Sequence, residues 1–307
     1  MTQKITLTIR IPAHNEEANI KNLLSNLLHQ KTNGFELKEI IVYSDGSTDE
    51  TVSQARSVSD TRIKVVDNKN RQGKNTTQNK IFKRSNSDIL LILDADVLPE
   101  NKNFLNSMVK AFVGNKKLSL VAAKVLPVSD DSLVSITLAH SQYLKLLMLE
   151  KVAKSKPVYV CNGRAMAYSK VFYKSLEIPT KLLADDAYAS LVCIQNGCGI
   201  YYQDSVGVLY QVPSTIEDHL KQSTRFFNGR AQLSKIFGTS FIEDQYKIPV
   251  FITSQIFIKG LCIDFRKTLF YIAILITSKF LSVFNKDKLN YKWEMATSSK
   301  KLIKLYD

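Results

Sequence analysis

The chain has 307 residues, which is enough for one large α/β domain with an appendage or for two modest domains. A hydrophobic fraction of 45% is ordinary for a globular protein, and 11 glycines and 7 prolines are too few for a low-complexity or fibrous chain. The net charge of +14 predicts anionic partners, which are nucleic acid, phospholipid head groups or phosphorylated small molecules, without choosing among them.

The four cysteines, Cys161, Cys193, Cys198 and Cys262, include no CxxC pair. We therefore expect no zinc site and interpret them as thiols in a reducing compartment. The chain begins with a strand pattern over residues 5–11, so we expect no signal peptide.

The first two thirds of the chain alternates strand and helix patterns. Strands are predicted from apolar residues at 5–11, 39–43, 63–67, 89–93 and 118–124. Helices are predicted between them, with 74–84 as one of them. This order indicates a mostly parallel, doubly wound sheet.

Three of the helices carry start signals. Asn15 precedes two glutamates and a stripe of leucines, which is typical of a helix N-cap. Ser47 with Glu50, and Ser214 with Glu217, have the spacing of capping boxes. We expect helices to begin directly after Asn15, Ser47 and Ser214.

The composition changes near residue 248. Residues 248–265 and 268–284 are apolar stretches, but the longer uninterrupted one has only 17 residues and a membrane span needs roughly 20. We expect an interfacial helix or re-entrant hairpin, with the lysines of 286–304 on anionic lipid at the cytoplasmic face of a membrane. The alternative is a buried helical pair packed on the rest of the chain. We divide the chain into a main domain, 1–240, and a membrane-associating helical tail, 241–307.

Chemically suggestive residues follow three of the predicted strands. Ligands of open α/β sheets bind at the carboxyl ends of the strands. The residues found there are Pro12, Asn15 and Glu16, then Asp45, Gly46 and Ser47, and finally Asp94 and Asp96. Folding alone does not require three strands to deliver carboxylates to one sheet edge.

Asp94 and Asp96 are two carboxylates in a loop that leaves a buried strand. In isolation such a pair is more often two solvated aspartates. Beside the other acidic strand ends we favour a site for one hard cation, with a nucleotide diphosphate and water as the remaining ligands.

Two further segments have both an ordinary and a functional interpretation. Asp45 to Asp49 is a turn with a helix cap, yet Asp45 also ends a strand at the acidic edge. Arg71, Gly73 and Lys74 form a basic loop that suits phosphates, although alone it resembles ordinary surface.

Asp185 and Asp186 are adjacent carboxylates, which repel unless a ligand or cation offsets them. One of them is a reasonable general base. Gln222 and Arg225, spaced i and i+3, share a helical face beside Phe226, and an exposed helix face is the ordinary alternative.

Six short motifs together resemble glycosyltransferase family 2. In chain order they are IPAHNEEANI, YSDGSTDET, RQGK, LDADVLPE, ADDAYASL and QSTRF, from Ile11 to Phe226. The resemblance implies a GT-A fold, in which helices flank a doubly wound mixed α/β sheet. It also implies inverting transfer of a sugar from a UDP- or GDP-sugar to a hydroxyl of a glycan, lipid or polyprenyl phosphate, with Mg²⁺ or Mn²⁺, as in the synthesis of cell-envelope polysaccharide.

The resemblance further implies roles for individual residues. Asp186 matches the catalytic base, Asp96 the metal ligand, and Asp94 an aspartate that faces ribose and metal. Gln222, Arg225 and Phe226 match a motif that closes over diphosphate and acceptor. The implied donor-binding positions are Pro12, Ala13, Glu16, Asp45, Gly46, Ser47, Gly73, Lys74, Asp94 and Phe226.

The chain departs from the family pattern at two positions. Asp185 stands where the family has glutamate, and Phe226 stands where it has tryptophan. Phenylalanine keeps an aromatic platform without the indole N–H donor, which argues against processive polymer synthesis. The multiple transmembrane helices of polymer synthases are also missing.

Other function classes fit less well. A nicotinamide enzyme needs a glycine-rich turn after the first strand, where this chain has Pro12 to Asn15, and no P-loop motif occurs. A sugar-nucleotide nucleotidyltransferase shares the sheet type but also needs that glycine-rich signature. A non-enzymatic nucleic-acid-binding protein explains the charge but not the acidic strand ends, so we expect no nucleic-acid partner.

Overall fold

The computed structural model describes residues 4–284, 298 and 300, and its centre is a mixed sheet of eight strands. The strand order is β3-β2-β1-β4-β7-β6-β8-β5. The strands are β1 (Ile5–Ala13), β2 (Phe35–Asp45), β3 (Ile63–Asn68), β4 (Ile89–Leu93), β5 (Val97–Pro99), β6 (Leu118–Val128), β7 (Ala165–Ser169) and β8 (Gly199–Gln211).

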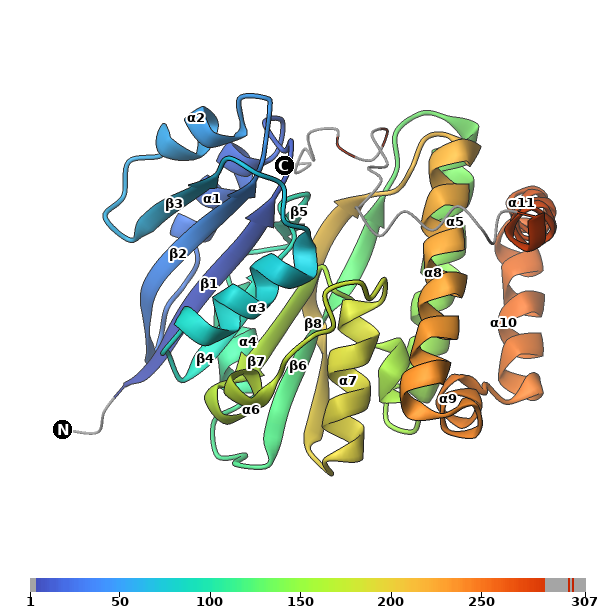
Figure 1. The fold of residues 1–307 in the computed structure, drawn as a ribbon. Coiled ribbons are helices and arrows are strands. Elements are labelled where there is room, and N and C mark those ends of the chain that lie inside the picture. Colours follow the sequence, from blue (N-terminus) through green and yellow to red (C-terminus); the bar gives the residue numbers. More distant parts are fainter. Residues whose placement is uncertain (1–3, 285–297, 299, 301–307) are drawn as a thin grey trace.

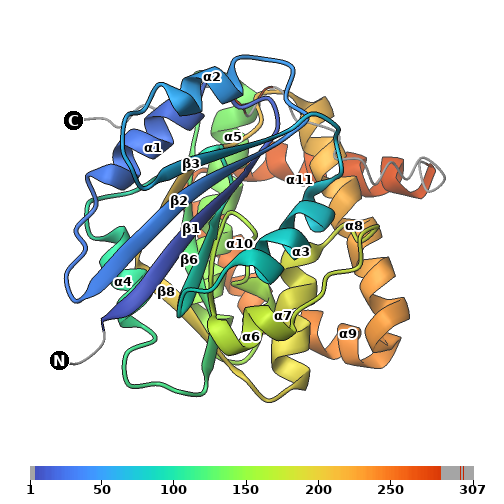
Figure 2. The ribbon, with the colours of Figure 1, turned by 60° about the vertical axis from the view of Figure 1, so that its left-hand side comes forward.

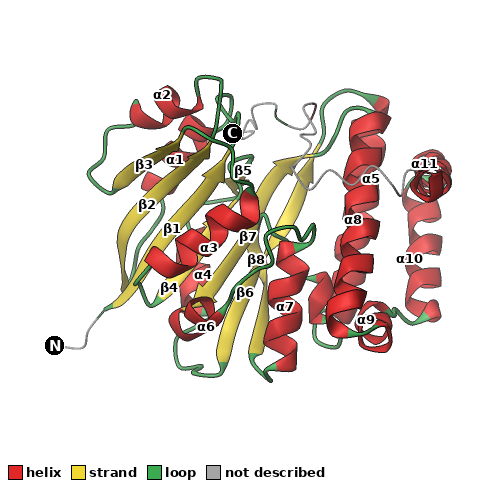
Figure 3. Ribbon diagram, viewed as in Figure 1, coloured by secondary structure: helices red, strands yellow, loops and turns green. Residues whose placement is uncertain are grey.

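Helices cover both faces of the sheet (Figure 3). The helices are α1 (Ile20–Leu28), α2 (Thr51–Arg56), α3 (Lys74–Arg84), α4 (Phe104–Lys110), α5 (Leu133–Val152), the 3₁₀-helix η1 (Pro157–Tyr159), α6 (Lys170–Ser175), α7 (Asp185–Gln195), α8 (Ile216–Phe237), α9 (Thr239–Tyr246), α10 (Val250–Ile263) and α11 (Phe265–Phe284).

The sheet has a parallel half and a mixed half. Strands β1, β2, β3 and β4 are parallel, as the alternation of strands and helices predicts. Strand β7 is antiparallel to both β4 and β6, while β8 runs parallel to β6. The predicted mixed α/β sheet flanked by helices is therefore confirmed.

Two hydrophobic cores lie on opposite faces of the sheet. In β4, Ile89, Leu91 and Leu93 pack into the core that α1 and α4 cover, and Leu90 and Ile92 pack into the core that α3, α6 and α7 cover. All five side chains are buried, as an unbroken apolar strand predicts. Figure 2 shows α3 and α6 on one face of the parallel strands.

The predicted helix starts after Asn15 and Ser47 are wrong. Helix α1 begins at Ile20, because residues 16–19 form a turn in which the Glu16 carbonyl accepts the amide N–H of Ile20. Helix α2 has Glu50 at its N-cap. The Ser47 hydroxyl instead accepts the amide N–H of Asn15 at 3.2 Å, so it links two loops.

The third predicted start is displaced by one residue. Thr215 caps α8, because its hydroxyl accepts the amide N–H of Asp218 at 3.2 Å. The helix then continues through Phe237, well beyond Arg225.

Helices α10 and α11 pack on α5, and α11 also contacts α8. A Cβ on Gly260 would lie 2.7 Å from Leu144, so glycine permits the close approach of α10 to α5. The Thr268 hydroxyl lies 2.9 Å from Nε2 of His140, which ties α11 to the same helix. The inner faces of the tail helices are thus packed on the main domain, as the buried-pair alternative predicts.

The outer sides of these helices remain apolar and exposed. No single helix of the described chain is long and apolar enough to cross a bilayer, whereas α9 and α10 together meet that test with a bend of 42°. Apart from Lys300, the tail lysines assigned to lipid lie outside the described residues. Large exposed apolar side chains of the tail include Val250, Phe251, Ile258, Phe265 and Ile276.

Candidate active site

The carboxyl ends of β1, β2 and β4 meet at one edge of the sheet (Figure 1). The parallel register places Pro12 of β1 opposite Tyr43 of β2, two residues before Asp45. The loop after β4 carries Asp94 and Asp96 to the same edge. The sheet therefore brings the three acidic strand ends together, as their positions in the sequence predict.

Lys74 belongs to a charged cluster at this edge, to which α3, the loop after β4, α7 and α8 each contribute a residue. It is the first residue of α3, and its side chain is only 8% exposed. Its ammonium lies 3.2 Å from Oδ1 of Asp94 and 3.4 Å from Oδ2 of Asp185. Arg225 of α8 lies 3.7 Å from the other oxygen of Asp185. Residues separated by more than a hundred positions thus form one charged cluster.

The charge of Lys74 is stabilised by its carboxylate neighbours. Burial alone lowers the pKa of a lysine, but Asp185 and Asp94 outweigh it and raise the pKa of Lys74. The cluster therefore holds a permanent cation where the predicted donor-binding motifs converge.

The two adjacent aspartates have different surroundings. Asp185 is buried between Lys74 and Arg225. Asp186 is half-buried, and its Oδ2 accepts the amide N–H of Gly163 at 2.9 Å. Asp185 is therefore positioned to hold cations, whereas Asp186 is directed toward the loop before β7.

Asp45 holds the basic loop. Its two carboxylate oxygens accept the amide N–H groups of Gln72 and Gly73, each at 2.8 Å. Gly46 has a φ of +68°, and a Cβ there would lie 2.9 Å from the Arg71 amide nitrogen, so glycine is required for this approach. A small cavity at this point is lined by Pro12, Ala13, His14, Asp45, Arg71, Gly73, Lys74 and Thr77.

Glu16, Asp94 and Asp96 create a negative potential beside Lys74. Burial, and then the charge of Asp96, raise the pKa of Glu16 to about 7, although Lys300 opposes the shift. Burial also raises the pKa of Asp94, which Lys74 opposes and Asp96 reinforces. Among the described residues, no three His, Cys, Asp or Glu side chains gather closely enough to hold a metal by themselves. A cation here would need ligands from a bound molecule.

Helix α8 brings part of its predicted motif to the cluster. Arg225 donates from Nε to the Leu183 carbonyl at 3.0 Å. The helix approaches this segment closely, because a Cβ on Gly229 would lie 2.8 Å from that of Ala184. Phe226 is half exposed and packs edge-on against Tyr246. Gln222 is half-buried on the same helix, three residues before Arg225.

Two residues at the site were not predicted from the sequence. The Arg164 carbonyl accepts the amide N–H of Asp94 at 3.0 Å, and its guanidinium lies 3.9 Å above the Tyr210 ring. Lys300 reaches Glu16 from the far end of the chain, at 2.5 Å. Neither residue has a motif around it that would have identified it, since each reaches the site through the tertiary fold.

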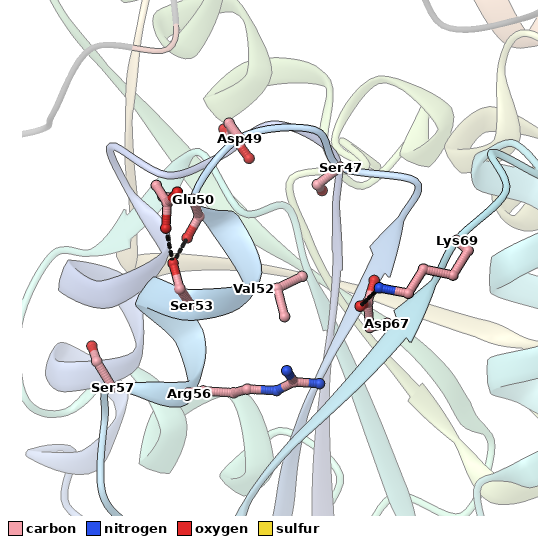
Figure 4. Close-up of a pocket in the computed structure, with 9 residues that line it drawn as sticks. All are labelled: Ser47, Asp49, Glu50, Val52, Ser53, Arg56, Ser57, Asp67 and Lys69. Atoms are coloured by element: carbon pink, nitrogen blue, oxygen red, sulfur yellow. Dashed lines mark hydrogen bonds and ion pairs between the residues drawn. The ribbon is translucent and has the colours of Figure 1, made fainter.

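A second cavity, with a volume of about 650 Å³, is a groove between α2 and β3 (Figure 4). Its lining includes Arg56 and the Asp67–Lys69 ion pair, with 2.7 Å between the charged atoms. Of the predicted site residues only Ser47 lines it, so the cavity does not coincide with the charged cluster.

Comparison with known proteins points to the same family as the sequence motifs. A sequence model of glycosyl transferase family 2 matches residues 8–176. The poly-beta-1,6-N-acetyl-D-glucosamine synthase of Staphylococcus aureus (strain COL) is 24% identical over 229 residues, which are 73% of this chain and 54% of that protein. The chain thus spans about half the length of this relative. The 4,4'-diaponeurosporenoate glycosyltransferase of Staphylococcus aureus (strain bovine RF122 / ET3-1) is 33% identical over 109 residues, which are 35% of this chain and 28% of that protein.

Solved structures support the fold. The mannosyltransferase PcManGT from Pyrobaculum calidifontis, solved with GDP-Man and Mn²⁺, superposes with a TM-score of 0.65 at 17% identity, over 93% of this chain and 89% of its own. TarS of S. aureus, residues 1–349 solved with UDP-GlcNAc, superposes with a TM-score of 0.52 at 17% identity. The superposition covers 72% of this chain and 65% of the TarS chain. The predicted GT-A fold is therefore confirmed.

Proposed function

Because this chain belongs to glycosyltransferase family 2, we propose that it transfers a sugar from a UDP- or GDP-sugar to an acceptor hydroxyl. The observation that carries the proposal is the cluster in which Lys74 lies between Asp94 and Asp185, with Arg225 on the far side. It unites four of the family motifs in one place and provides two cations for a diphosphate.

On the donor side, Asp96 and Asp94 would hold a Mg²⁺ or Mn²⁺ ion. The residues fit such an ion, because burial and mutual repulsion raise the pKa values of Asp94 and Glu16 around Asp96, and a divalent cation would relieve that repulsion. The chain supplies carboxylate oxygens, which both ions prefer, and the donor diphosphate would complete the coordination. When bound, the ion would act as a Lewis acid on the leaving diphosphate.

The chemical step we propose is an in-line displacement at the anomeric carbon. Asp186 takes the proton from the acceptor hydroxyl as the new glycosidic bond forms. The bond to the diphosphate breaks, and Lys74 and Arg225 neutralise the charge that develops on it. Asp185 orients both cations through its two oxygens. The anomeric configuration of the transferred sugar is inverted, as in the family.

The first experiment is a donor screen. The purified protein is incubated with UDP-glucose, UDP-galactose, UDP-GlcNAc and GDP-mannose in Mg²⁺ and in Mn²⁺, and release of UDP or GDP is measured. The names of the similar proteins put UDP-GlcNAc and GDP-mannose first. We expect metal-dependent release from at least one donor, increased by glycan, lipid or polyprenyl phosphate acceptors.

The rival functions give different results in that screen. A nucleotidyltransferase would consume sugar 1-phosphate with a nucleoside triphosphate. A basic nucleic-acid-binding protein would release no nucleotide and would bind DNA in a salt-dependent manner. Either result would contradict the proposal.

We also propose that residues 241–307 form a membrane-associating tail behind a catalytic domain of residues 1–240. The support is the exposed apolar side of α10 and α11, which lie at the edge of the molecule farthest from β3 (Figure 1). Val250 is 79% exposed and Ile276 is 66% exposed. The positive net charge favours an anionic lipid surface, and we infer that the protein lies at the cytoplasmic face of a membrane that carries its acceptor.

The membrane proposal predicts vesicle binding that depends on the outward side chains. The combined variant Phe251→Ser, Phe265→Ser and Ile276→Ser should lose co-sedimentation with vesicles that contain anionic lipid. These substitutions avoid the inner face that packs on α5, whereas deletion of the tail would also expose that face. Val171→Ser on α6, 85% exposed in the wild type, is the matched control. If the wild-type protein stays in the supernatant with these vesicles, the tail is not a membrane anchor.

A further inference from the structure

The ammonium of Lys300 occupies a site made of three oxygen atoms in the loop after β1. It lies 2.5 Å from Oε1 of Glu16 and donates to the carbonyls of His14 at 2.7 Å and Asn15 at 2.9 Å. An ammonium group has three N–H donors, so this loop satisfies all of them. The side chain is 19% exposed, which means that Lys300 is turned into the protein and not toward lipid.

The loop that Lys300 holds has an unusual backbone. Asn15 has a φ of +54°, and it is the only non-glycine residue of the described chain with a positive φ. This left-handed conformation is unfavourable for most residues and persists only where contacts determine it. The Lys300 ammonium binds the carbonyl of Asn15 and that of the preceding residue, His14. The Asn15 side chain adds a further contact, because its Oδ1 accepts the Thr48 amide N–H at 2.9 Å.

The same loop presents residues to the donor side of the charged cluster. His14 lines the small cavity beside Asp45 and Lys74. Glu16 is buried and lies near enough to Asp96 for their charges to repel. The positive charge of Lys300 offsets that repulsion and keeps the Glu16 carboxylate in place.

A second contact ties the C-terminal segment to α8. Oγ of Ser298 accepts the Ser214 amide N–H at 3.2 Å, and the Ser298 amide N–H donates to Asp218 at 3.0 Å. Ser298, which contacts the start of α8, is thus only two residues before Lys300, which contacts the loop after β1. Ser298 therefore contacts the helix that carries Arg225, and Lys300 contacts the loop that carries Glu16.

We propose that Lys300 is a positioning residue for the donor nucleotide. It fixes the turn of residues 14–16 in the conformation that presents His14 and Glu16 to the donor, and with Ser298 it holds this turn in register with α8. The inference rests on the proposed glycosyltransferase function. It assigns part of the C-terminal tail to the donor site.

The test compares Lys300→Gln with Lys300→Arg, using Lys110→Gln on the exposed end of α4 as the control for loss of one lysine charge. We expect Lys300→Gln to raise the donor KM and weaken UDP or GDP binding in calorimetry by roughly tenfold, as for loss of a charged hydrogen-bond donor. The value of kcat should stay within about twofold. Lys300→Arg should restore most of the affinity, and Lys110→Gln should match the wild type.

Hydrogen exchange provides a readout that needs no substrate. Lys300→Gln should speed exchange in the peptides that contain residues 14–19 and leave β4 and α3 unchanged. Ser298→Ala, which removes only the hydroxyl acceptor at α8, should give a smaller increase in donor KM. Unchanged exchange and nucleotide affinity in Lys300→Gln would overturn the inference, as would tighter binding, because the lysine would then obstruct the site. If the wild-type protein binds neither UDP nor GDP, the proposed function fails, while the exchange result still tests the contact.

Discussion

Replacing Asp96 with alanine should abolish sugar transfer, by more than about a thousandfold, and leave the protein folded. Asp96 lies in a turn between β4 and β5, outside both hydrophobic cores. Its carboxylate is one of only two that the loop after β4 offers to a cation. The loss should exceed that of a single oxyanion donor, typically a hundred- to a thousandfold, because a metal neutralises more charge than one hydrogen bond.

Three measurements separate loss of the metal from loss of the fold. Initial transfer rates are measured with Mg²⁺ or Mn²⁺ titrated in, binding of Mn²⁺ in the presence of UDP or GDP is followed by calorimetry, and thermal unfolding reports stability. Asp67→Ala is the matched control, because Asp67 lies near the end of β3, lines the groove between α2 and β3, and pairs with exposed Lys69. Wild-type transfer that continues at full rate in EDTA would show that no metal is needed.

The central strands and their acidic ends could be predicted from the sequence because their signals are local. Strand β4 is an unbroken apolar run, and its buried position follows from that run alone. Since β1, β2 and β4 are parallel, their carboxyl ends had to meet at one edge. The clustering of Asp45 with Asp94 therefore followed from the strand order without knowledge of any side-chain contact.

The loop conformations could not be predicted, because competing partners decide them. Ser47 has the sequence spacing of a capping residue, but its hydroxyl accepts the Asn15 amide N–H and a hydrogen bond from the hydroxyl of Ser44. Asn15 looks like a helix cap, yet it adopts a left-handed turn stabilised by Thr48 and Lys300. The contacts of Asn15 with Ser47, Thr48 and Lys300 join segments that lie far apart in the sequence, and no local pattern encodes them.

Strands β7 and β8 and the C-terminal contact were missed for a related reason. Strand β7 is inserted antiparallel between β4 and β6, and β8 pairs with both β6 and β5. Such pairings join strands that are separated by many residues, so no local pattern in the sequence indicates them. The lysine-rich sequence predicts that Lys300, like its neighbours, contacts lipid. Composition indicates the charge of such a segment, but it does not indicate which way a single lysine side chain points.

The two adjacent aspartates show what the tertiary structure adds. The sequence offers either as a base and favours Asp186 only by resemblance to the family. The fold gives a physical reason for the same assignment, because Asp185 lies buried between Lys74 and Arg225 and is committed to those cations. Asp186 lies one residue further along α7 and is half-buried.

Asp186→Asn should reduce kcat by about a hundred- to ten-thousandfold, the usual effect of removing a general base. Asparagine preserves the shape, and its amide oxygen can still accept the Gly163 N–H, but it cannot take a proton at neutral pH. Binding of UDP or GDP should stay within about twofold of the wild type, since the proposed donor contacts come from other residues. Initial rates and calorimetry on the purified variant measure both quantities.

Asp185→Asn is the matched comparison, with the same chemical change one residue away. It removes the carboxylate that holds Lys74 and Arg225 in place, so we expect weaker nucleotide binding and a higher donor KM, with a smaller loss of kcat than in Asp186→Asn. The two variants should therefore differ in which kinetic constant changes. If Asp185→Asn is inactive at saturating donor while Asp186→Asn is nearly normal, the base has been assigned to the wrong carboxylate. If both variants keep wild-type kcat, another group must deprotonate the acceptor, and the role of this pair is to hold Lys74 and Arg225 in place.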